Sequence, residues 1–246
     1  MSRNFEILHR SAVRPDLFFP AAVRTTDAAE SAEPPKRRAL SDDEITKLVQ
    51  RLFGSSAARS PTVVAFCGLD QGAGCSWVCA RTSEALAENV SGRVCVVDAN
   101  LRSPSLHAYF NAAPLPGFAE AMRDSAPIRN FIHGTQHSHL WLMTSGEAAG
   151  APNGSLNPEK LCARFAELRA EFDHVLVDTP SMNTYSDAVA LGRVTDGVVL
   201  VVESNSTRRE VARAAKESLD AAKIPILGAV LNRRTYPIPK ALYERM

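Results

Sequence analysis

The feature that most constrains the fold is an apolar run, a glycine-rich stretch and a helical pattern in direct succession. The run covers residues 63–66, the stretch 68–76 has the sequence Gly-Leu-Asp-Gln-Gly-Ala-Gly-Cys-Ser, and the helical pattern covers residues 77–88. In a strand, loop and helix of this kind, backbone N–H groups of the loop and of the first helical turn converge on one point, where the helix dipole favours an anion. The sequence therefore predicts a phosphate cradle at residues 68–76.

The end of this stretch departs from a complete phosphate-binding loop (P-loop). That motif ends in Gly-Lys-Ser or Gly-Lys-Thr, where the lysine reaches the β- and γ-phosphates and the hydroxyl reaches Mg²⁺. Here Gly74 and Ser76 are in place, but Cys75 stands at the lysine position. The lysine stabilises negative charge that develops on the phosphate during transfer. Removal of one comparable donor from an oxyanion hole lowers the rate by a factor on the order of 10²–10³. Arg81 and Arg102 are the nearby candidates to replace the lysine, although from stems of different geometry.

Strand and helix patterns alternate from residue 61 onward. The expected strands are continuous apolar runs, which are typical of a parallel sheet covered on both faces. The expected strands lie near residues 62–67, 93–98, 140–143, 174–178, 198–203 and 226–231, and the expected helices at 75–90, 158–171, 185–193 and 207–222. Ser206 or Thr207 is expected to cap the last helix. The sequence predicts an α/β fold with a doubly wound, mostly parallel sheet.

The two ends of the chain differ from this central part. Residues 1–40 are predicted to form a flexible N-terminal arm, because their polar, proline-containing composition is too poor in large apolar groups to fold alone. Ser41 and Glu44 have the spacing of a capping box, which predicts a helix beginning after Ser41. The domain is expected to cover residues 41–232, and residues 233–246 form a C-terminal tail.

Composition narrows the classes of function. The net charge of +1 gives no reason to expect a nucleic acid as partner. No apolar stretch approaches the ~18 residues needed to cross a bilayer, so no transmembrane segment is expected. The 5 cysteines lack Cys-x-x-Cys spacing, which argues against a disulfide framework. These features together predict a soluble, cytoplasmic protein.

Two expected strands end in aspartate, at Asp98 and at Asp178. Ligands of an open parallel sheet bind beyond the carboxyl ends of its strands, so we expect both carboxylates to meet the 68–76 loop at one edge. A phosphate cradle beside acidic groups suits a nucleotide with Mg²⁺, because the metal takes oxygen ligands.

The segment that contains Asp98 resembles a known family. Residues 94–107 have the sequence Val-Cys-Val-Val-Asp-Ala-Asn-Leu-Arg-Ser-Pro-Ser-Leu-His, which is similar to the second ATP motif of bacterial tyrosine kinases of the capsular and exopolysaccharide type. These kinases are relatives of the MinD/ParA-type P-loop ATPases. Residues 173–180 resemble their Walker B motif, and residues 196–202 and 228–232 resemble two further family segments. The resemblance covers about residues 45–232.

The resemblance implies a fold, a pathway and a set of site residues. It implies a doubly wound P-loop domain that uses ATP and Mg²⁺, forms homo-oligomers and works with a membrane polysaccharide co-polymerase (a chain-length determinant protein) in polymerisation and export. The implied nucleotide-binding residues are Gly68, Gly72, Ala73, Gly74, Cys75, Ser76 and Trp77. The implied metal-binding residues are Ser76, Asp98 and Asp178. Asp98 and Asp178 would also activate the attacking hydroxyl, and Arg102 would lie near the transferred phosphoryl group or the neighbouring subunit.

Departures from the family pattern leave three functions open. Besides the missing lysine, Asn100 replaces a second aspartate, and an asparagine cannot take up a proton. The family's C-terminal tyrosine cluster is reduced to Tyr236 and Tyr243. The three alternatives are a weak tyrosine kinase, a non-catalytic regulator with the kinase fold, and a MinD/ParA-like positioning ATPase. The last is disfavoured by Arg102, and by Asp70 and Gln71 where such ATPases carry an early lysine.

Three smaller signals each have two interpretations. Cys75 at a helix N-terminus is either a thiol of lowered pKa that gates the site or a small residue tolerated after the lysine was lost. Trp77 either stacks on the nucleotide base or packs the helix against the sheet. His133, His137 and His139 form either a metal site or a solvated loop.

Overall fold

A computed structural model describes residues 39–54, 60–113, 115–147 and 156–234. All of them belong to one unit, residues 35–246. The predicted N-terminal arm and C-terminal tail lie outside the described residues, except for residues 39–40 and 233–234. Among the described residues, no helix has the length and apolar content needed to cross a membrane.

The described residues form a seven-stranded sheet with the order β3-β4-β2-β5-β1-β6-β7. Only β3 and β4 pair in antiparallel fashion, and the other neighbours are parallel. The strands are β1 (Val63–Gly68), β2 (Val94–Asp98), β3 (His133–Gly134), β4 (Leu140–Met143), β5 (His174–Thr179), β6 (Gly197–Glu203) and β7 (Ile226–Asn232). The six expected strands are confirmed, and the short β3 was not expected.

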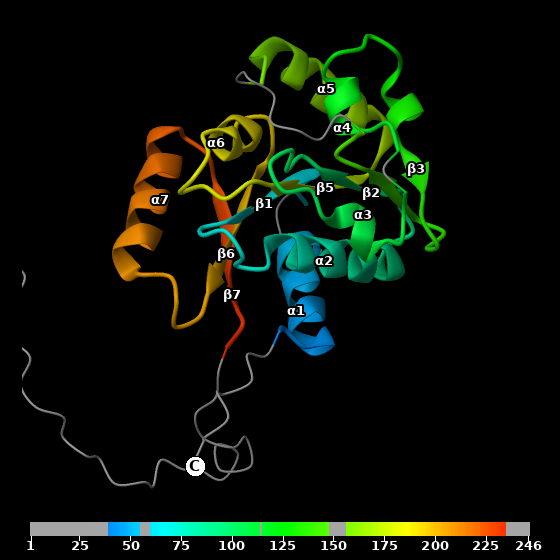
Figure 1. Cartoon of the computed structure of the whole chain (residues 1–246). Helices are drawn as coiled ribbons and strands as arrows, with labels where there is room; N and C mark the ends of the chain where they lie inside the picture. Colours follow the sequence, from blue (N-terminus) through cyan, green and yellow to red (C-terminus); the bar gives the residue numbers. More distant parts are fainter. Residues whose placement is uncertain (1–38, 55–59, 114, 148–155, 235–246) are drawn as a thin grey trace, which may run out of the picture. The chain divides into compact units, whose positions relative to one another are not determined.

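Helices cover both faces of this sheet (Figure 1). They are α1 (Asp42–Phe53), α2 (Cys75–Asn89), α3 (Leu106–Tyr109), α4 (Phe118–Ala121), α5 (Pro158–Glu171), α6 (Asp187–Gly192) and α7 (Arg209–Ala221), with a 3₁₀ helix at Ile128–Phe131. The five helices expected at α1, α2, α5, α6 and α7 are confirmed. The one-turn helices α3 and α4 and the 3₁₀ helix were not expected.

The strand β1 shows how the two layers of helices are packed. Its residues alternate between the faces of the sheet, as in any strand. Val64 and Phe66 belong to the core shared with α1 and α2, whereas Ala65 and Cys67 belong to the core shared with α6 and α7. A third core lies under α4 and α5. Burial on both faces explains why the strands are continuous apolar runs, and it confirms the doubly wound architecture.

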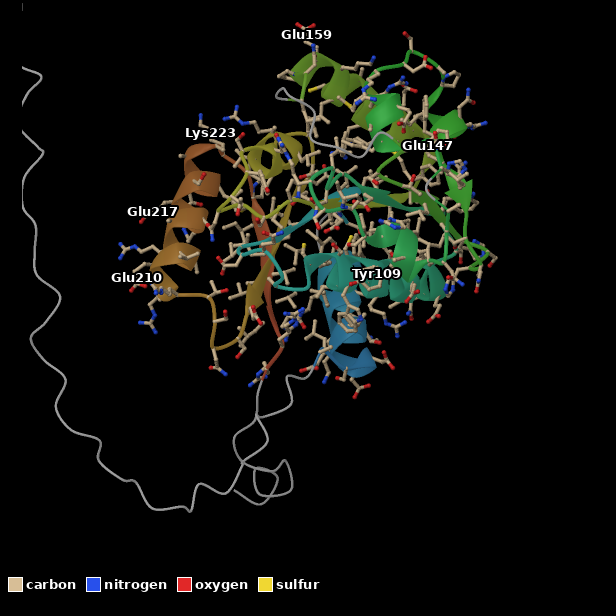
Figure 2. All side chains as sticks on the ribbon, in the orientation of Figure 1. Tyr109, Glu147, Glu159, Glu210, Glu217 and Lys223 are labelled. Carbon is tan, nitrogen blue, oxygen red and sulfur yellow. The ribbon has the colours of Figure 1, made fainter. Side chains whose placement is uncertain are left out.

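The ends of the first and last helices differ in how well the sequence predicts them. At α1 the expected capping box is present, because the Glu44 N–H donates to the Ser41 hydroxyl and the Ser41 N–H donates to the Glu44 carboxylate at 2.8 Å. At α7 the expected cap is wrong. Arg208 is the N-cap residue and gives no side-chain bond, while the Thr207 hydroxyl donates to Asp70 instead. On the outer side of α7, Glu210 and Glu217 project away from the sheet (Figure 2).

Candidate phosphate site

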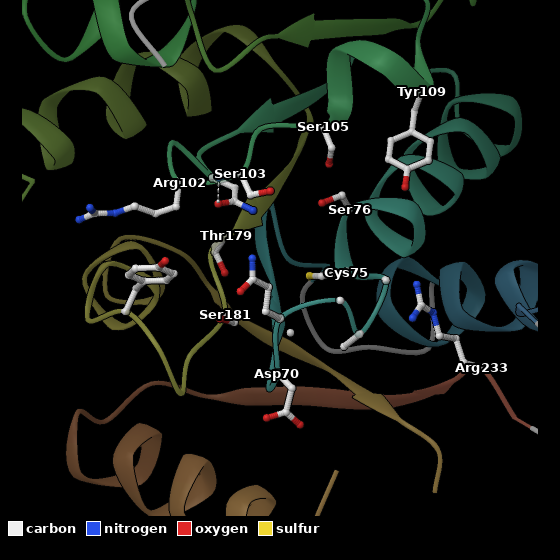
Figure 3. A pocket seen from close by; sticks show the side chains of 17 residues that line it. Asp70, Cys75, Ser76, Arg102, Ser103, Ser105, Tyr109, Thr179, Ser181 and Arg233 are labelled. Atoms are coloured by element: carbon white, nitrogen blue, oxygen red, sulfur yellow. Dashed lines mark hydrogen bonds between the residues drawn. The ribbon is translucent and has the colours of Figure 1, made fainter. Parts of the chain in front are cut away.

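A cavity of about 230 Å³ opens at the carboxyl edge of the sheet (Figure 3). It lies between the loop after β1, the segment after β2, the segment after β5 and the end of β7. Its walls include seven residues predicted from the sequence: Gly68, Gly72, Ala73, Gly74, Cys75, Ser76 and Arg102. Ten further residues complete its walls: Asp70, Gln71, Asn100, Ser103, Ser105, Tyr109, Thr179, Ser181, Tyr185 and Arg233.

The 68–76 loop has the backbone of an anion cradle. Gly72 and Gly74 have φ angles of +83° and +82°, which only glycine adopts without strain. Gly74 is the N-cap residue of the 15-residue helix α2, and no side chain in the described part of the chain caps that helix. The N–H groups of the first turn of α2 therefore face the cavity without a side-chain acceptor, at the positive end of the helix dipole.

Asn232 ties the end of β7 to this loop. Its buried side-chain amide donates to the carbonyl oxygen of Ala73 at 2.9 Å. A Cβ atom at Gly74 would lie 2.4 Å from the Asn232 amide nitrogen, so this position requires glycine for space as well as for its backbone angle. The sequence analysis matched residues 228–232 to the family but assigned no role to Asn232.

Asp70 ties the loop to two further segments. Its carboxylate accepts a hydrogen bond from the Asn183 amide at 3.0 Å and one from the Thr207 hydroxyl at 2.7 Å. These partners follow β5 and β6, so the loop is fixed to both strands that flank β1. Asp70 is therefore a structural anchor of the loop.

The two predicted carboxylates lie side by side, and neither belongs to the cavity wall. The parallel register of β2 and β5 places Asp98 opposite Asp178, and both residues are fully buried. Asp98 accepts three backbone hydrogen bonds of 3.0–3.2 Å, from the N–H groups of Asn100, Ser105 and Leu106. Burial raises the pKa of Asp98 to about 6, and these bonds oppose the shift. Asp98 thus holds the segment after β2 and the start of α3.

Asp178 is in a different state. Both of its carboxylate oxygens are buried and lack a hydrogen-bond partner among the described residues. Burial, and then the charge of Asp98, raise its pKa to about 8. The Ser76 hydroxyl and the Cys75 thiol lie near enough to oppose this shift, but neither makes a hydrogen bond of normal geometry with the carboxylate. A buried carboxylate without partners is costly, and a bound cation would remove that cost.

These residues fit Mg²⁺ better than a metal held by protein ligands alone. The described residues contain no group of three or more histidine, cysteine, aspartate and glutamate side chains suited to a metal ion. Mg²⁺ needs fewer protein ligands, because it keeps several waters and binds substrate phosphates. Ser76 and Asp178 supply oxygen atoms beside the cradle. The same result disfavours a metal site at the three histidines, and the His133 ring contacts the Pro116 carbonyl oxygen at 2.9 Å.

Of the two interpretations of Cys75, the structure favours the small residue tolerated after the lysine was lost. Burial raises the pKa of this thiol well above its usual value, and the negative charge of Asp178 raises it further. By its surface area Cys75 is half-buried, on the wall of the cavity. Cys75 is a neutral side chain at the position where a P-loop carries its positive charge.

Neither arginine proposed to replace the lysine lies at the lysine position. The Arg102 guanidinium bonds the Asp187 carboxylate at 3.3 Å and lies 5.1 Å from the centre of the Tyr185 ring. In Figure 3 it points away from Ser76 and Cys75. Arg81 is not on the cavity wall and pairs with Asp42 and Glu84.

Trp77 is also absent from the wall of this cavity, among the residues the structure describes. It is partly buried and packs against the core under α1 and α2. The structure thus gives Trp77 the packing role. Arg233 and Tyr109, in contrast, were not predicted and do line the cavity.

Comparison with known proteins places the chain in a family. A family model described as "Cellulose biosynthesis protein BcsQ" matches residues 62–224, which is more than half of the chain. The chain belongs to this family. The chain is also similar in sequence to relatives named as tyrosine-protein kinases and in fold to solved kinase domains and to MinD, as described below.

Two relatives illustrate the sequence similarity. The chain is 33% identical over 140 residues to "Tyrosine-protein kinase YwqD" of Bacillus subtilis (strain 168), which covers 57% of this chain and 59% of that protein. It is 28% identical over 145 residues to "Putative tyrosine-protein kinase CapB" of Staphylococcus aureus, covering 59% and 63%. The chain thus spans less than two thirds of the length of either relative.

Solved structures confirm the fold. The chimerical protein CapA2B2 matches with a TM-score of 0.70 and 24% identity, over 79% of this chain and 85% of that one. The kinase domain of the Escherichia coli tyrosine kinase ETK matches with a TM-score of 0.68 and 22% identity, over 80% and 78%. The septum site-determining protein MinD of Pyrococcus horikoshii OT3, complexed with Mg-ADP, has a TM-score of 0.59 and 21% identity, over 75% and 77%. At these identities the likeness concerns the fold of a P-loop NTPase.

Proposed function

We propose that this protein binds ATP with Mg²⁺ at the 68–76 loop and acts as a tyrosine-kinase-like regulator of polysaccharide polymerisation and export. One observation carries the nucleotide-binding part of this proposal. The first turn of α2 has no side-chain cap within the described part of the chain, and beneath it lies the buried, unpartnered carboxylate of Asp178. The turn favours a phosphate and the carboxylate favours a cation, so together they fit a metal-bound phosphate.

Each part of the site has a proposed role. The backbone N–H groups of residues 72–76 would bind the phosphates, and Ser76 and Asp178 would hold Mg²⁺, which neutralises phosphate charge when bound. Asp98 would mainly hold the segment after β2, because three backbone N–H groups already occupy its oxygens. The cavity of about 230 Å³ is smaller than the ~300–1,000 Å³ pockets that enclose whole small molecules. It therefore fits the phosphate end of the nucleotide.

Tyrosine phosphorylation by this site would be slow. The acceptor hydroxyl must lose a proton, and Asp178 is the carboxyl group available to take it. Burial and the charge of Asp98 raise its pKa to about 8, which favours the protonated form. A bound cation would favour the ionised form but would also make the carboxylate a weaker base. Asn100 cannot accept the proton, and its side-chain oxygen already accepts the Ser103 N–H at 3.2 Å.

A second candidate is a non-catalytic regulator that keeps the kinase fold. The specific observation in its favour is the neutral thiol of Cys75 against Asp178, which leaves the lysine position without charge. A positioning ATPase of the MinD type is disfavoured, because Asp70 occupies part of the early loop and is bonded to Thr207 and Asn183.

The proposed partner is a membrane polysaccharide co-polymerase, and the proposed location is the cytoplasmic face of the membrane, as a homo-oligomer. The support is the family membership and the relatives named as tyrosine-protein kinases, taken together with the resemblance of residues 94–107 to the capsular and exopolysaccharide type.

Calorimetric titration of the protein with Mg-ATP tests the nucleotide-binding proposal. The same titration is made on Cys75→Lys and on the matched control Cys162→Lys, which changes an exposed cysteine on α5. We expect micromolar binding by the natural protein, tighter binding by Cys75→Lys and no change in the control. Binding only by Cys75→Lys would favour the non-catalytic regulator, and binding by none of the three would overturn the proposal. A phosphotyrosine assay on the binding variants then separates the kinase from the regulator.

A further inference from the structure

Arg233 is a cation on the cavity wall that the proposed function has not used. It follows the last residue of β7, and its side chain is 39% exposed. Its Nε atom lies 3.8 Å from the position that a Cβ atom of Gly74 would take. In Figure 3 Arg233 and Arg102 are on opposite sides of the cavity, and the guanidinium of Arg233 faces the loop. The loop therefore has a positive charge beside Gly74.

The backbone holds Arg233 in this position. Arg233 has a φ of +54°, a left-handed conformation that costs a residue with a side chain on the order of 1 kcal/mol or more. The residue before it is fixed on both sides, because Asn232 donates to Ala73 and its carbonyl accepts the Ser204 N–H at 2.9 Å. A strained residue held by such anchors is typical of functional sites.

The charge of Arg233 is directed into the cavity. Within the described part of the chain, its ion pair joins Nη1 to the Glu203 carboxylate at 3.5 Å, the limit of a hydrogen bond. A guanidinium has five N–H donors, so this contact leaves most of them for a ligand. Burial, and then the charge of Asp178, raise the pKa of the Tyr109 phenol, and the positive charge of Arg233 opposes this shift.

We propose that Arg233 donates hydrogen bonds to the phosphate group held by the 68–76 loop, and so supplies from the end of β7 the positive charge that Cys75 does not. This inference rests on the proposed nucleotide binding and names the residue that would allow it without the lysine. A guanidinium presents parallel donors to phosphate oxygens, which makes arginine suited to this role.

Titration with inorganic tripolyphosphate and with Mg-ATP tests the inference. Because a hydrogen bond to a charged group contributes strongly to the binding free energy, Arg233→Gln should weaken binding of both ligands by about 10- to 100-fold. Arg233→Lys keeps the positive charge and should bind with intermediate affinity. Arg234→Gln, the neighbouring arginine outside the cavity wall, is the matched control and should bind like the natural protein.

Two further measurements separate a phosphate contact from a structural effect. The affinity of Arg233→Gln should depend less steeply on salt concentration than that of the natural protein, because one charge contact is missing. Cys75→Lys in the Arg233→Gln background should restore binding. Equal binding by Arg233→Gln and the natural protein would overturn the role of Arg233 alone. Absence of binding by the natural protein would overturn this inference and the proposed function together.

Discussion

Asp178 shows how strongly the surroundings change the chemistry of one residue. The pKa of its buried carboxyl group is raised to about 8 from 3.8, so between these pH values the folded chain holds a proton that the unfolded chain has lost. The free energy of unfolding contributed by this group is therefore fully present below the lower pH, and it is lost as the pH rises through about 8.

Asp178→Asn should remove this pH dependence. Asparagine has nearly the same shape and cannot ionise, so the variant should be more stable than the natural protein at alkaline pH. We expect the natural protein to lose on the order of 2 kcal/mol between pH 6 and pH 8, and the variant to lose much less. Urea unfolding across this range measures both. The exposed Asp43→Asn is the control, and equal pH dependence in Asp178→Asn and the natural protein would show that Asp178 is ionised throughout.

At the scale of elements, the 68–76 loop depends on contacts that close long distances along the chain. Gly72 and Gly74 share the same left-handed backbone, but a Cβ atom at Gly72 would meet nothing within 4 Å, whereas one at Gly74 would meet the amide of Asn232 at 2.4 Å. Substitutions at the two positions therefore distinguish the free-energy cost of backbone strain alone from that of strain together with displacement of Asn232 at the end of β7.

Gly72→Ala should destabilise the protein by about 1 kcal/mol through backbone strain alone. Gly74→Ala should cost about 3 kcal/mol, because the bond between Asn232 and Ala73 must also break or shift. Urea unfolding of the two variants gives the difference directly. Similar losses in both variants would mean that Asn232 moves aside freely and does not hold the loop.

Sequence patterns predicted the long elements and failed for the short ones. The six expected strands are continuous apolar runs, and each end was predicted to within one residue. The one-turn helices have no such pattern, because distant contacts set them. The start of α3 is held by Asp98, and α4 begins where Phe118 and Ala119 donate to the carbonyl oxygens of residues 144 and 145. Thr207 is of a residue type that often caps a helix, yet its hydroxyl donates a hydrogen bond to Asp70 instead.

At the scale of the whole molecule, the site is assembled from strand ends that are neighbours only in the sheet. The aspartates were predictable, because the ends of parallel strands meet at one edge. The place of Arg233 could not be predicted. Its distance from the loop depends on the pairing of β7 with β6 and on the hydrogen bond from Asn232 to Ala73, 159 positions away in the chain.

A ligand that joins these strand ends should stabilise the whole fold, since it binds the folded chain and not the unfolded one. At about 100 times its dissociation constant, Mg-ATP should add about 2.7 kcal/mol to the free energy of unfolding. ATP with a chelator should add less, because Asp178 then gains no cation. In Asp178→Asn the difference between ATP with and without Mg²⁺ should disappear, while Asp43→Asn should retain it. Thermal and urea unfolding at fixed pH measure these shifts, and a Mg²⁺ effect that survives in Asp178→Asn would assign the metal to other oxygens than those of Asp178.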